Sequence, residues 1–467
     1  HHPQCMAHQY RLPVHACSRQ LSLMTGLPRR LIMLVKMILF AMVFSGSAVT
    51  AFVVSASLSS SNARMLSPLG MCHADHIVDL QAQHPALSPS LILSSLADSC
   101  EEMGMKTLDV YGDFNLTSEE SSLRKLEANL SDTFGKEDAV FMPSGVMAQN
   151  IALLIHATEK KKLFACHHSS HLLLHEQDAY RELLKMEPII IDTTNENAAG
   201  GLHIPAMRSH HVKSIFLSRT NAEQLSTLIL ELPHRELGGK LTPWPEVLQI
   251  GNMCRTHGVK YHCDGARIFE AAAGYGLNLK EIVEPFDSVY ISFYKGLGGL
   301  SGAMLMGDAK FCQEARVWLR RLGGNLYTLM PYIISAHAGY HKHVIDPCMT
   351  FTEKKEKLQR IIQRLSSDPL ISAYVTFDPK IPETNMVHGY MTTSIEECKT
   401  AIQEVEKVTG IRILSRIRPV EANERAKQLG YQTKFEWTMG SANGAIDDNQ
   451  FLNGWRAFSH CFSQPDK

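Results

Sequence analysis

The stretch that most constrains the fold is DSVYISFYKGLGGLSG, residues 287–302, a strand-like segment that ends at one lysine and continues into glycines. Before Lys295 the residues alternate and are β-branched or aromatic, which is typical of a strand inside a sheet. The following glycines leave room for a ligand and allow backbone conformations that other residues rarely adopt. They are Gly296, Gly298, Gly299 and Gly302. On its own the segment favours a strand, a turn and an exposed lysine, but two further segments change this interpretation.

The second segment, GVKYHCDGARIFEAA, places a carboxylate at the end of another predicted strand. Residues 259–263 alternate, and Asp264 and Gly265 end the strand before a predicted helix. Asp264 therefore lies at the carboxyl edge of a strand, where open α/β sheets bind their ligands. Taken alone, this aspartate is better explained as a cap of the next helix.

The third segment, AVFMPSGVMAQNIALLIHA, predicts a short strand, a turn at Ser144 and Gly145, and a helix. Free backbone N–H groups and the positive end of the helix dipole face such a turn, so it can bind an anion. A Ser-Gly pair before a helix is more often only a cap. Just before it, residues 118–134 predict an amphipathic helix capped at Thr117 or Ser118.

Together the three segments fit pyridoxal phosphate better than any other cofactor. An amine is needed for its aldehyde, an anion site for its phosphate, and a carboxylate to keep its pyridine nitrogen protonated so that the ring can accept electrons. Lys295, the turn at Ser144 and Gly145, and Asp264 supply one group of each kind. We therefore predict a pyridoxal phosphate enzyme.

The chain resembles the low-specificity L-threonine aldolases, within the group of threonine aldolases and aromatic amino-acid β-eliminating lyases. The segments that carry the resemblance are YGD (111–113), FGKEDAVFMPSGVMAQN (134–150), SHLLLHE (170–176), LELPHRELGG (230–239), HCDGAR (262–267) and SFYKGLGG (292–299). The resemblance implies the aspartate-aminotransferase-like α/β fold. We expect a large catalytic domain with a mostly parallel sheet over residues 91–345, and a small C-terminal α/β domain over 346–467.

The resemblance also implies how the cofactor is bound. Lys295 would bind its aldehyde and Asp264 its pyridine nitrogen. The phosphate would lie over Ser144, Gly145 and Val146. The family has a threonine where this chain has Val146, so the site loses a hydroxyl but keeps its backbone donors.

For the substrate, the resemblance implies three residues. His171 would stack on the cofactor ring near the substrate's β-hydroxyl and act as the base, and Arg267 would hold the carboxylate through two parallel hydrogen bonds. Tyr111 would belong to the wall of the site. His171 and His175 also have the spacing of a metal pair, but no carboxylate completes a metalloprotease pattern, and we predict no metal.

The sequence departs from the aldolase pattern around the substrate. The family's Glu-Asn-Thr-His segment is replaced by residues 231–236, ELPHRE. The family's N-terminal Ser-Asp-Thr and small-domain arginine have no clear match, with Ser94 or Ser95 and Lys434 as the candidates. Substrate specificity is therefore the least determined property.

The activity that the resemblance implies is cleavage of the Cα–Cβ bond of L-threonine or another β-hydroxy-α-amino acid to glycine and an aldehyde, by a homodimer or homotetramer. The alternatives are β-elimination, transamination or decarboxylation with the same cofactor, and a non-catalytic binding protein. The net charge of −1 and the absence of long Lys/Arg runs give no sign of nucleic-acid binding. Eleven cysteines without CxxC pairs indicate a reducing compartment.

Residues 1–75 are expected to be a targeting presequence. Arg29, Arg30 and Lys36 precede the apolar run MILFAMVF and the small residues SGSAVTA, as in a signal peptide. A segment with Ser, Ala and Arg64 follows Phe52 and resembles a transit peptide. The combination indicates delivery to a complex plastid. The alternatives are the secretory pathway and a membrane anchor beginning at Leu31, which would be the protein's one membrane contact.

Overall fold

The computed structural model describes residues 77–105, 121–194, 202–420 and 424–463. The expected presequence, Tyr111 and the expected cap at Thr117 or Ser118 lie outside these residues.

A seven-stranded sheet runs through the part of the chain that carries the lysine segment, in the order β2-β8-β7-β6-β5-β3-β4. Neighbouring strands from β4 to β7 are parallel, and β8 is antiparallel to both β7 and β2. The mostly parallel sheet is therefore confirmed. Its strands are β2 (Asp138–Met142), β3 (Leu163–His167), β4 (Glu187–Ile191), β5 (Leu225–Glu231), β6 (Lys260–Gly265), β7 (Ser288–Ser292) and β8 (Ala303–Gly307).

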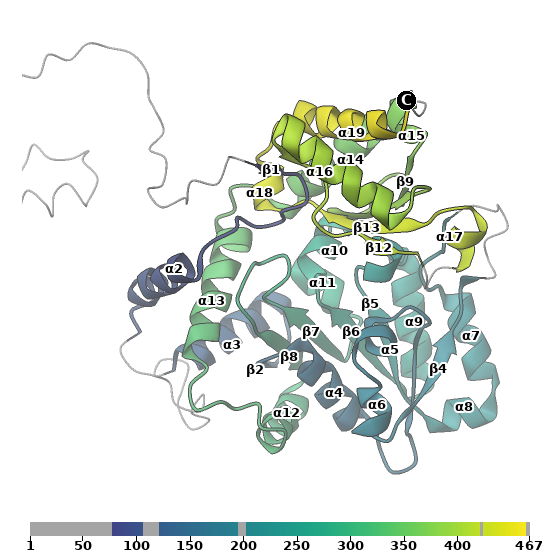
Figure 1. The fold of residues 1–467 in the computed structure, drawn as a ribbon. Coiled ribbons are helices and arrows are strands. Elements are labelled where there is room, and N and C mark those ends of the chain that lie inside the picture. Colours follow the sequence, from purple (N-terminus) through teal and green to yellow (C-terminus); the bar gives the residue numbers. More distant parts are fainter. Residues whose placement is uncertain (1–76, 106–120, 195–201, 421–423, 464–467) are drawn as a thin grey trace, which may run out of the picture. The chain divides into compact units, whose positions relative to one another are not determined.

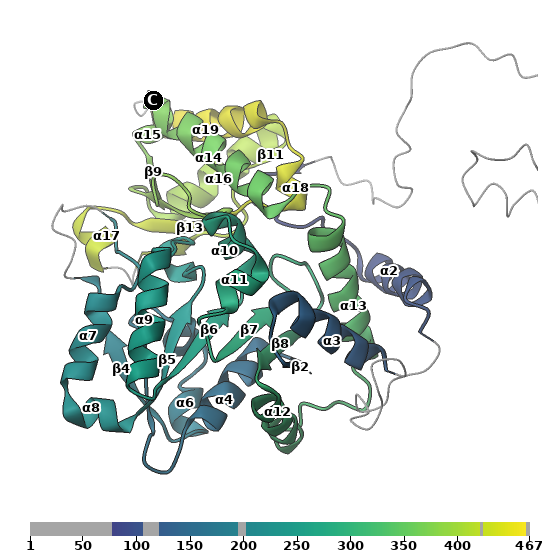
Figure 2. The same cartoon turned by 180° about the vertical axis from the view of Figure 1, so that it is seen from behind.

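Helices cover both faces of this sheet, as Figures 1 and 2 show from opposite sides. One face carries α4 (Gly145–His156), α5 (His171–His175), α6 (Ala179–Glu182) and α12 (Ala309–Arg321). The other carries α3 (Ser122–Phe134), α7 (Ser209–Leu217), α9 (Trp244–Thr256), α10 (Ile268–Tyr275) and α11 (Leu279–Val283). The remaining helices of this region are α2 (Pro89–Glu102), α8 (Arg219–Gln224), η3 (Arg235–Leu237), α13 (Met330–Tyr340) and η4 (His341–Ile345). The near-continuous apolar runs of the central strands follow from this double cover.

The helix α3 confirms the predicted apolar face but not the predicted cap. Leu123, Leu126, Leu130 and Phe134 are all buried in the core on that side of the sheet. The helix begins after Ser121, whose hydroxyl accepts a hydrogen bond from the Arg124 N–H. The cap assigned to Thr117 or Ser118 was therefore wrong, because several residues of this serine-rich stretch satisfy the capping pattern equally well.

The C-terminal part builds a second, four-stranded antiparallel sheet in the order β12-β13-β10-β9. Its strands are β9 (Val375–Asp378), β10 (Met386–Met391), β12 (Arg418–Pro419) and β13 (Thr433–Thr438). Its longer helices are α14 (Phe351–Ser367), α16 (Ile395–Thr409) and α19 (Asp448–Ser463), and its shorter ones are α15 (Pro369–Ser372), α17 (Glu424–Gln428) and α18 (Ser441–Gly444). The segment IRILSRI (411–417) contributes only β11 (Ile411–Arg412), which pairs with β1 (Val78–Asp79) and does not join this sheet.

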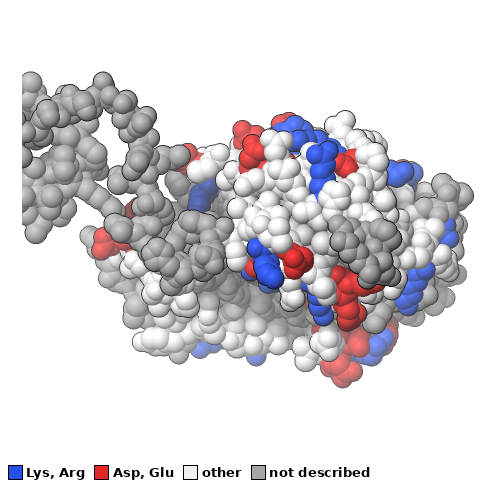
Figure 3. Space-filling model, turned by 45° about the horizontal axis from the view of Figure 1, so that its top comes forward, with Lys and Arg blue, Asp and Glu red and all other residues white. Residues whose placement is uncertain are grey.

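Each sheet has an apolar core of its own, and Phe351 at the start of α14 packs into the core of the large sheet. Lys240, which is 1% exposed, reaches from the region of the large sheet to Asp378 at the end of β9, with 2.7 Å between Nζ and Oδ2. On the face shown in Figure 3, cations and anions are interspersed. Within the described residues, no helix has the length and apolar character needed to span a bilayer.

Candidate active site

The parallel register brings three strand ends to one edge of the large sheet. Glu231 at the end of β5 pairs with Asp264 at the end of β6, and Asp264 pairs with Tyr290 on β7. Lys295 follows β7 by three residues. Asp264 and Lys295 lie close enough to influence each other's charge, as do Asp264 and His171. The structure therefore brings together the lysine, aspartate and histidine that the sequence predicted.

Asp264 is buried and accepts two hydrogen bonds. The Gln149 side-chain amide donates to Oδ2 at 2.6 Å, and the backbone N–H of Ala266 donates to Oδ1 at 3.2 Å. Burial, together with the nearby Glu231, raises the pKa of Asp264 to about 6. A carboxyl group in this environment gains most from a cation placed beside it, such as a protonated pyridine nitrogen.

Lys295 lies in a loop whose shape is fixed by backbone hydrogen bonds from its glycines. The N–H of Gly298 donates to the Lys295 carbonyl at 3.0 Å, and the N–H of Gly299 donates to the Phe293 carbonyl at 2.8 Å. Gly298 has a φ of +67°, which a residue with a side chain rarely adopts. Burial and the nearby Arg267 lower the pKa of Lys295 to about 8. A larger share of this amine is thus neutral near pH 7 than for an exposed lysine, as attack on an aldehyde requires.

The turn before α4 lies against the same loop. The hydroxyl of Ser144 accepts a hydrogen bond from the Met147 N–H at 3.3 Å, which caps the helix. The N–H of Gly302 donates to the Pro143 carbonyl at 3.2 Å, so the turn and the lysine loop are joined. A Cβ on Gly145 would overlap the Tyr290 hydroxyl. This cradle of small residues at a helix N-terminus fits a phosphate group, whereas the Val146 side chain is 37% exposed.

His171 begins α5 and is held by two carboxylates. Its Nδ1 is 3.1 Å from Oε1 of the buried Glu176, and its backbone N–H donates to Glu231 Oε2 at 3.3 Å. A carboxylate only accepts, so Nδ1 carries the proton and Nε2 is free to accept one. Glu231 is itself buried. Although burial raises its pKa, His234 and the N–H groups of Arg235 and His171 bring that pKa below its usual value.

Arg267 precedes α10 and faces a carboxylate from the second sheet. Its Nη2 is 3.7 Å from Oε1 of Glu436 on β13. The other oxygen of Glu436 is 2.9 Å from Nε of Arg235. Lys434, a candidate for the substrate carboxylate, lies 3.3 Å from Glu236 Oε2. Ser94 and Ser95 are exposed on α2, where Ser95 donates to its own helix at Ile92.

Sequence inspection missed several polar residues of this site. Gln149 and Glu436 were assigned no role, and neither was His262, which bonds to Gln149 Oε1 at 2.7 Å. Glu231 was assigned none either. The polar pair Gln149 and Asn150 in a mostly apolar helix was a usable signal for Gln149. Glu436 gave no such signal, because an alternating strand normally exposes charges on one face.

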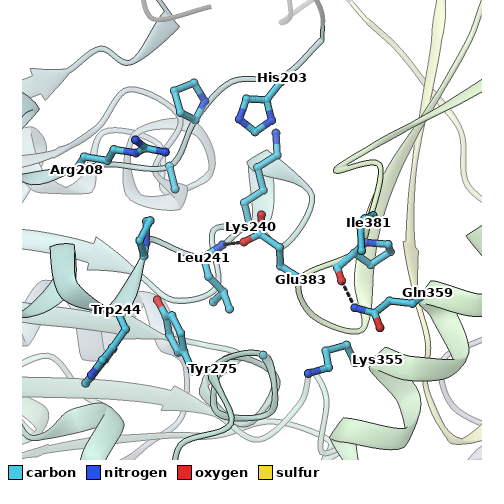
Figure 4. A pocket seen from close by; sticks show the side chains of 15 residues that line it. His203, Arg208, Lys240, Leu241, Trp244, Tyr275, Lys355, Gln359, Ile381 and Glu383 are labelled. Carbon is cyan, nitrogen blue, oxygen red and sulfur yellow. Dashed lines mark hydrogen bonds between the residues drawn. The ribbon is translucent and has the colours of Figure 1, made fainter.

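Figure 4 shows a separate pocket of about 560 Å³, where a hydrogen bond joins the Leu241 N–H to Glu383 at 2.7 Å. Trp244 and Tyr275 lie side by side at the lower left of this view, and Lys355 lies at the lower right. None of the residues predicted to bind the cofactor or the substrate lines it. Within the described ranges, no group of three or more His, Cys, Asp or Glu side chains could hold a metal ion.

Comparison with known proteins identifies the family. The sequence profile of the β-eliminating lyase family matches residues 95–392. The chain is 31% identical over 253 residues to a protein of Arabidopsis thaliana named probable low-specificity L-threonine aldolase 2, covering 52% of this chain and 67% of that protein. Over the first curated relatives, the matched part spans between 50% and 67% of their length.

Two solved structures extend the comparison. A crystal structure from Listeria monocytogenes, described as an L-allo-threonine aldolase, is similar with a TM-score of 0.69 and 31% identity, over 83% of this chain and 97% of that chain. The serine palmitoyltransferase of Sphingomonas wittichii, at 14% identity and a TM-score of 0.53 over 82% of this chain and 86% of that chain, shares the fold alone. These findings confirm the predicted fold and the predicted cofactor. The chain therefore belongs to the β-eliminating lyase family and is a lyase that works with pyridoxal phosphate.

Proposed function

We propose that the protein is an aldolase that cleaves the Cα–Cβ bond of L-threonine or a related β-hydroxy-α-amino acid. The observation that carries this proposal is the convergence of Lys295, Asp264, His171 and Arg267 at one sheet edge. The Arabidopsis relative and the Listeria structure carry threonine aldolase names, which supports the same activity. In the reaction the β-hydroxyl loses its proton, the Cα–Cβ bond breaks, an aldehyde leaves, and a proton added at Cα gives glycine.

The cofactor would be held by residues of three elements. Lys295 Nζ would bind its aldehyde, the carboxylate of Asp264 its pyridine nitrogen, and the backbone of Ser144, Gly145 and Val146 its phosphate. When bound, pyridoxal phosphate accepts the electron pair that the broken bond leaves behind.

The chain's own residues bind the substrate and move its protons. The guanidinium of Arg267 binds the substrate carboxylate and so fixes the orientation of the Cα–Cβ bond. Nε2 of His171 takes the proton from the β-hydroxyl, because Glu176 holds the imidazole in the tautomer that leaves this nitrogen free. The pKa of Lys295, lowered to about 8 by burial and Arg267, suits its Nζ to return a proton to Cα near neutral pH.

The test is to measure products from the full chain and two variants. We expect the wild type to show the visible absorbance of bound cofactor and to release acetaldehyde and glycine from L-threonine, and benzaldehyde from L-phenylserine. Lys295→Ala should lose both the absorbance band and turnover, and His171→Gln should keep the band and lose most turnover. Lys310→Ala, an exposed lysine on α12, is the matched control and should change neither.

The same assay distinguishes the alternatives. A β-eliminating lyase would produce a 2-oxo acid and ammonia instead of an aldehyde and glycine. Bound cofactor without aldehyde release would therefore overturn the aldolase proposal while keeping the family. Turnover by Lys295→Ala would overturn the assignment of the lysine.

We further propose a homodimer or homotetramer and delivery to a plastid. The family resemblance supports the first, and the signal-like and transit-like segments of residues 1–75 support the second. Light scattering of the purified chain would measure the mass of the assembly. Imaging of residues 1–75 fused to a fluorescent protein would test the destination, and a fusion retained in the secretory pathway would exclude the plastid.

A further inference from the structure

A buried line of hydrogen bonds extends from Asp264 away from the active site. Gln149 Nε2 donates to Asp264 Oδ2 at 2.6 Å, and Gln149 Oε1 is 2.7 Å from His262 Nε2. His262 Nδ1 is 2.7 Å from the Ser288 hydroxyl, which is 2.7 Å from His156 Nε2. Gln149, His262 and Ser288 are at most 1% exposed. We call Gln149, His262, Ser288 and His156 the Asp264 relay.

With Asp264 ionised, the direction of every hydrogen bond in the relay follows from the Asp264 end. The Gln149 amide must present its NH₂ group to Asp264, because its oxygen would otherwise face a carboxylate oxygen. Its own oxygen can then only accept, so His262 carries its proton on Nε2. Burial lowers the pKa of His262 to about 3 and that of His156 to about 4, so each imidazole is neutral at physiological pH and has one N–H.

The remaining two bonds are fixed in the same way. Because His262 Nδ1 has no proton, it accepts the hydroxyl proton of Ser288. The Ser288 oxygen therefore accepts from His156 Nε2. All four donors point toward Asp264, and donors arranged in one direction polarise each other so that the last one binds a negative charge more strongly.

We propose that Gln149, His262, Ser288 and His156 form a one-way chain of hydrogen-bond donors that keeps Asp264 charged and so strengthens its hold on the cofactor's pyridine nitrogen. These are positioning residues, since none of them would touch the cofactor. The proposal concerns cofactor binding only and holds whether the reaction is aldol cleavage or elimination.

The relay matters because the other groups around Asp264 do not ensure its charge. Glu231 on β5 opposes ionisation, whereas Lys295 and His171 favour it, as does the backbone N–H of Ala266. The Tyr290 hydroxyl lies on the neighbouring strand, and burial with the Asp264 charge raises its pKa well above the usual value. Burial is the largest of these influences and the pKa of Asp264 stays raised, to about 6, so each added donor, such as the Gln149 amide, strengthens the side of the balance that favours the charged form.

The test is the affinity of the full chain for pyridoxal phosphate, measured by equilibrium dialysis between pH 5.5 and 8.5. Without the relay, Asp264 should take up a proton at a higher pH than in the wild type. On acidification, the affinity for pyridoxal phosphate should therefore begin to fall at a higher pH in a relay variant than in the wild type. For Gln149→Leu we expect the Kd at pH 7 to rise by about tenfold or more and the pH midpoint to move up by about one unit. Ser288→Ala, further from Asp264, should shift both in the same direction by about threefold and half a unit.

Conservative and control variants separate this role from simple packing. Ser288→Thr retains the hydroxyl and should restore the wild-type midpoint. Ser226→Ala removes an equally buried hydroxyl from β5 that bonds to the Leu163 carbonyl, outside the relay, and should shift nothing. If Gln149→Leu fails to fold, the comparison of Ser288→Ala with Ser288→Thr tests the proposal instead. Wild-type affinity and midpoint in Ser288→Ala, or an equal shift in Ser226→Ala, would overturn the proposal.

Discussion

Replacing Glu436 by glutamine tests how the substrate carboxylate reaches Arg267. Glu436 Oε1 lies 3.7 Å from Arg267 Nη2, and the two side chains are 21% and 12% exposed. A substrate carboxylate that binds this guanidinium must compete with Glu436. Removing the negative charge at position 436 should therefore strengthen substrate binding.

The size of the effect can be worked from this distance. Two unit charges 3.7 Å apart attract by roughly 4 kcal/mol at an effective dielectric constant of about 20. Arg235 lies closer to Glu436, at 2.9 Å, and holds it in place, while water at the partly exposed pair screens the rest. We therefore take about a quarter of the attraction, ~1 kcal/mol, as the net competition. This corresponds to a KM about fivefold lower.

The assay is aldehyde release as a function of L-threonine concentration. Glu436→Gln should lower KM about fivefold and leave kcat within about twofold, because the change affects substrate and transition state equally. Glu236→Gln is the matched control. It removes the same charge from the same cluster, where Glu236 pairs with Lys434, Arg235 and His175 instead of Arg267. An unchanged or higher KM in Glu436→Gln would refute the competition, and an equal fall in Glu236→Gln would show a general field effect instead.

Three further predictions concern stability and the cofactor cradle. Because burial and Glu231 raise the pKa of Asp264 to about 6, above its unfolded value of about 4, ionisation costs stability as pH rises through this window. Thermal melts of the cofactor-free proteins should therefore show Asp264→Asn to be more stable than the wild type at pH 7, by about 2 kcal/mol, and equally stable at pH 4. Equal stability of the two proteins at both pH values would contradict this. Gly145→Ala should weaken cofactor binding at least about tenfold in dialysis, since its Cβ would overlap the Tyr290 hydroxyl and ring; wild-type affinity would contradict this. Lys240→Met should cost about 3–5 kcal/mol in denaturant unfolding, because Asp378 loses its buried partner; a cost near zero would show that water replaces the lysine.

The elements that were predictable from sequence are those whose signal is local. The face of α3 was read from the spacing of Leu123, Leu126, Leu130 and Phe134, and the end of β6 from Asp264-Gly265. The strand before Lys295 was predicted to run up to the lysine, but β7 ends at Ser292. The parallel arrangement of the strands was predictable because each of these strands is followed by a helix or by a ligand-binding loop. Chemistry needed at a strand end is visible in the residues at that end.

The contacts that escaped prediction join distant parts of the chain. Gln149 and His262 are 113 residues apart, and Arg267 meets Glu436 only because β13 is paired with β10 beside the large sheet. No periodicity encodes such a pair, since each partner alone resembles an ordinary polar position. The cap of α3 failed for a different reason, because several serines fit the same local rule.

The two carboxylates at the strand ends explain why this edge requires a cation. Glu231 receives backbone N–H groups from His171 and Arg235, which bring its pKa down although it is buried. Asp264 receives one backbone N–H and the amide of Gln149, and its pKa remains raised, to about 6. Two adjacent anions in a buried site repel, so the less stabilised one benefits most from a positive partner. A protonated pyridine ring bound beside Asp264 would supply that partner. Affinity for the cofactor and the charge of this aspartate should therefore change together in every variant that alters either carboxylate.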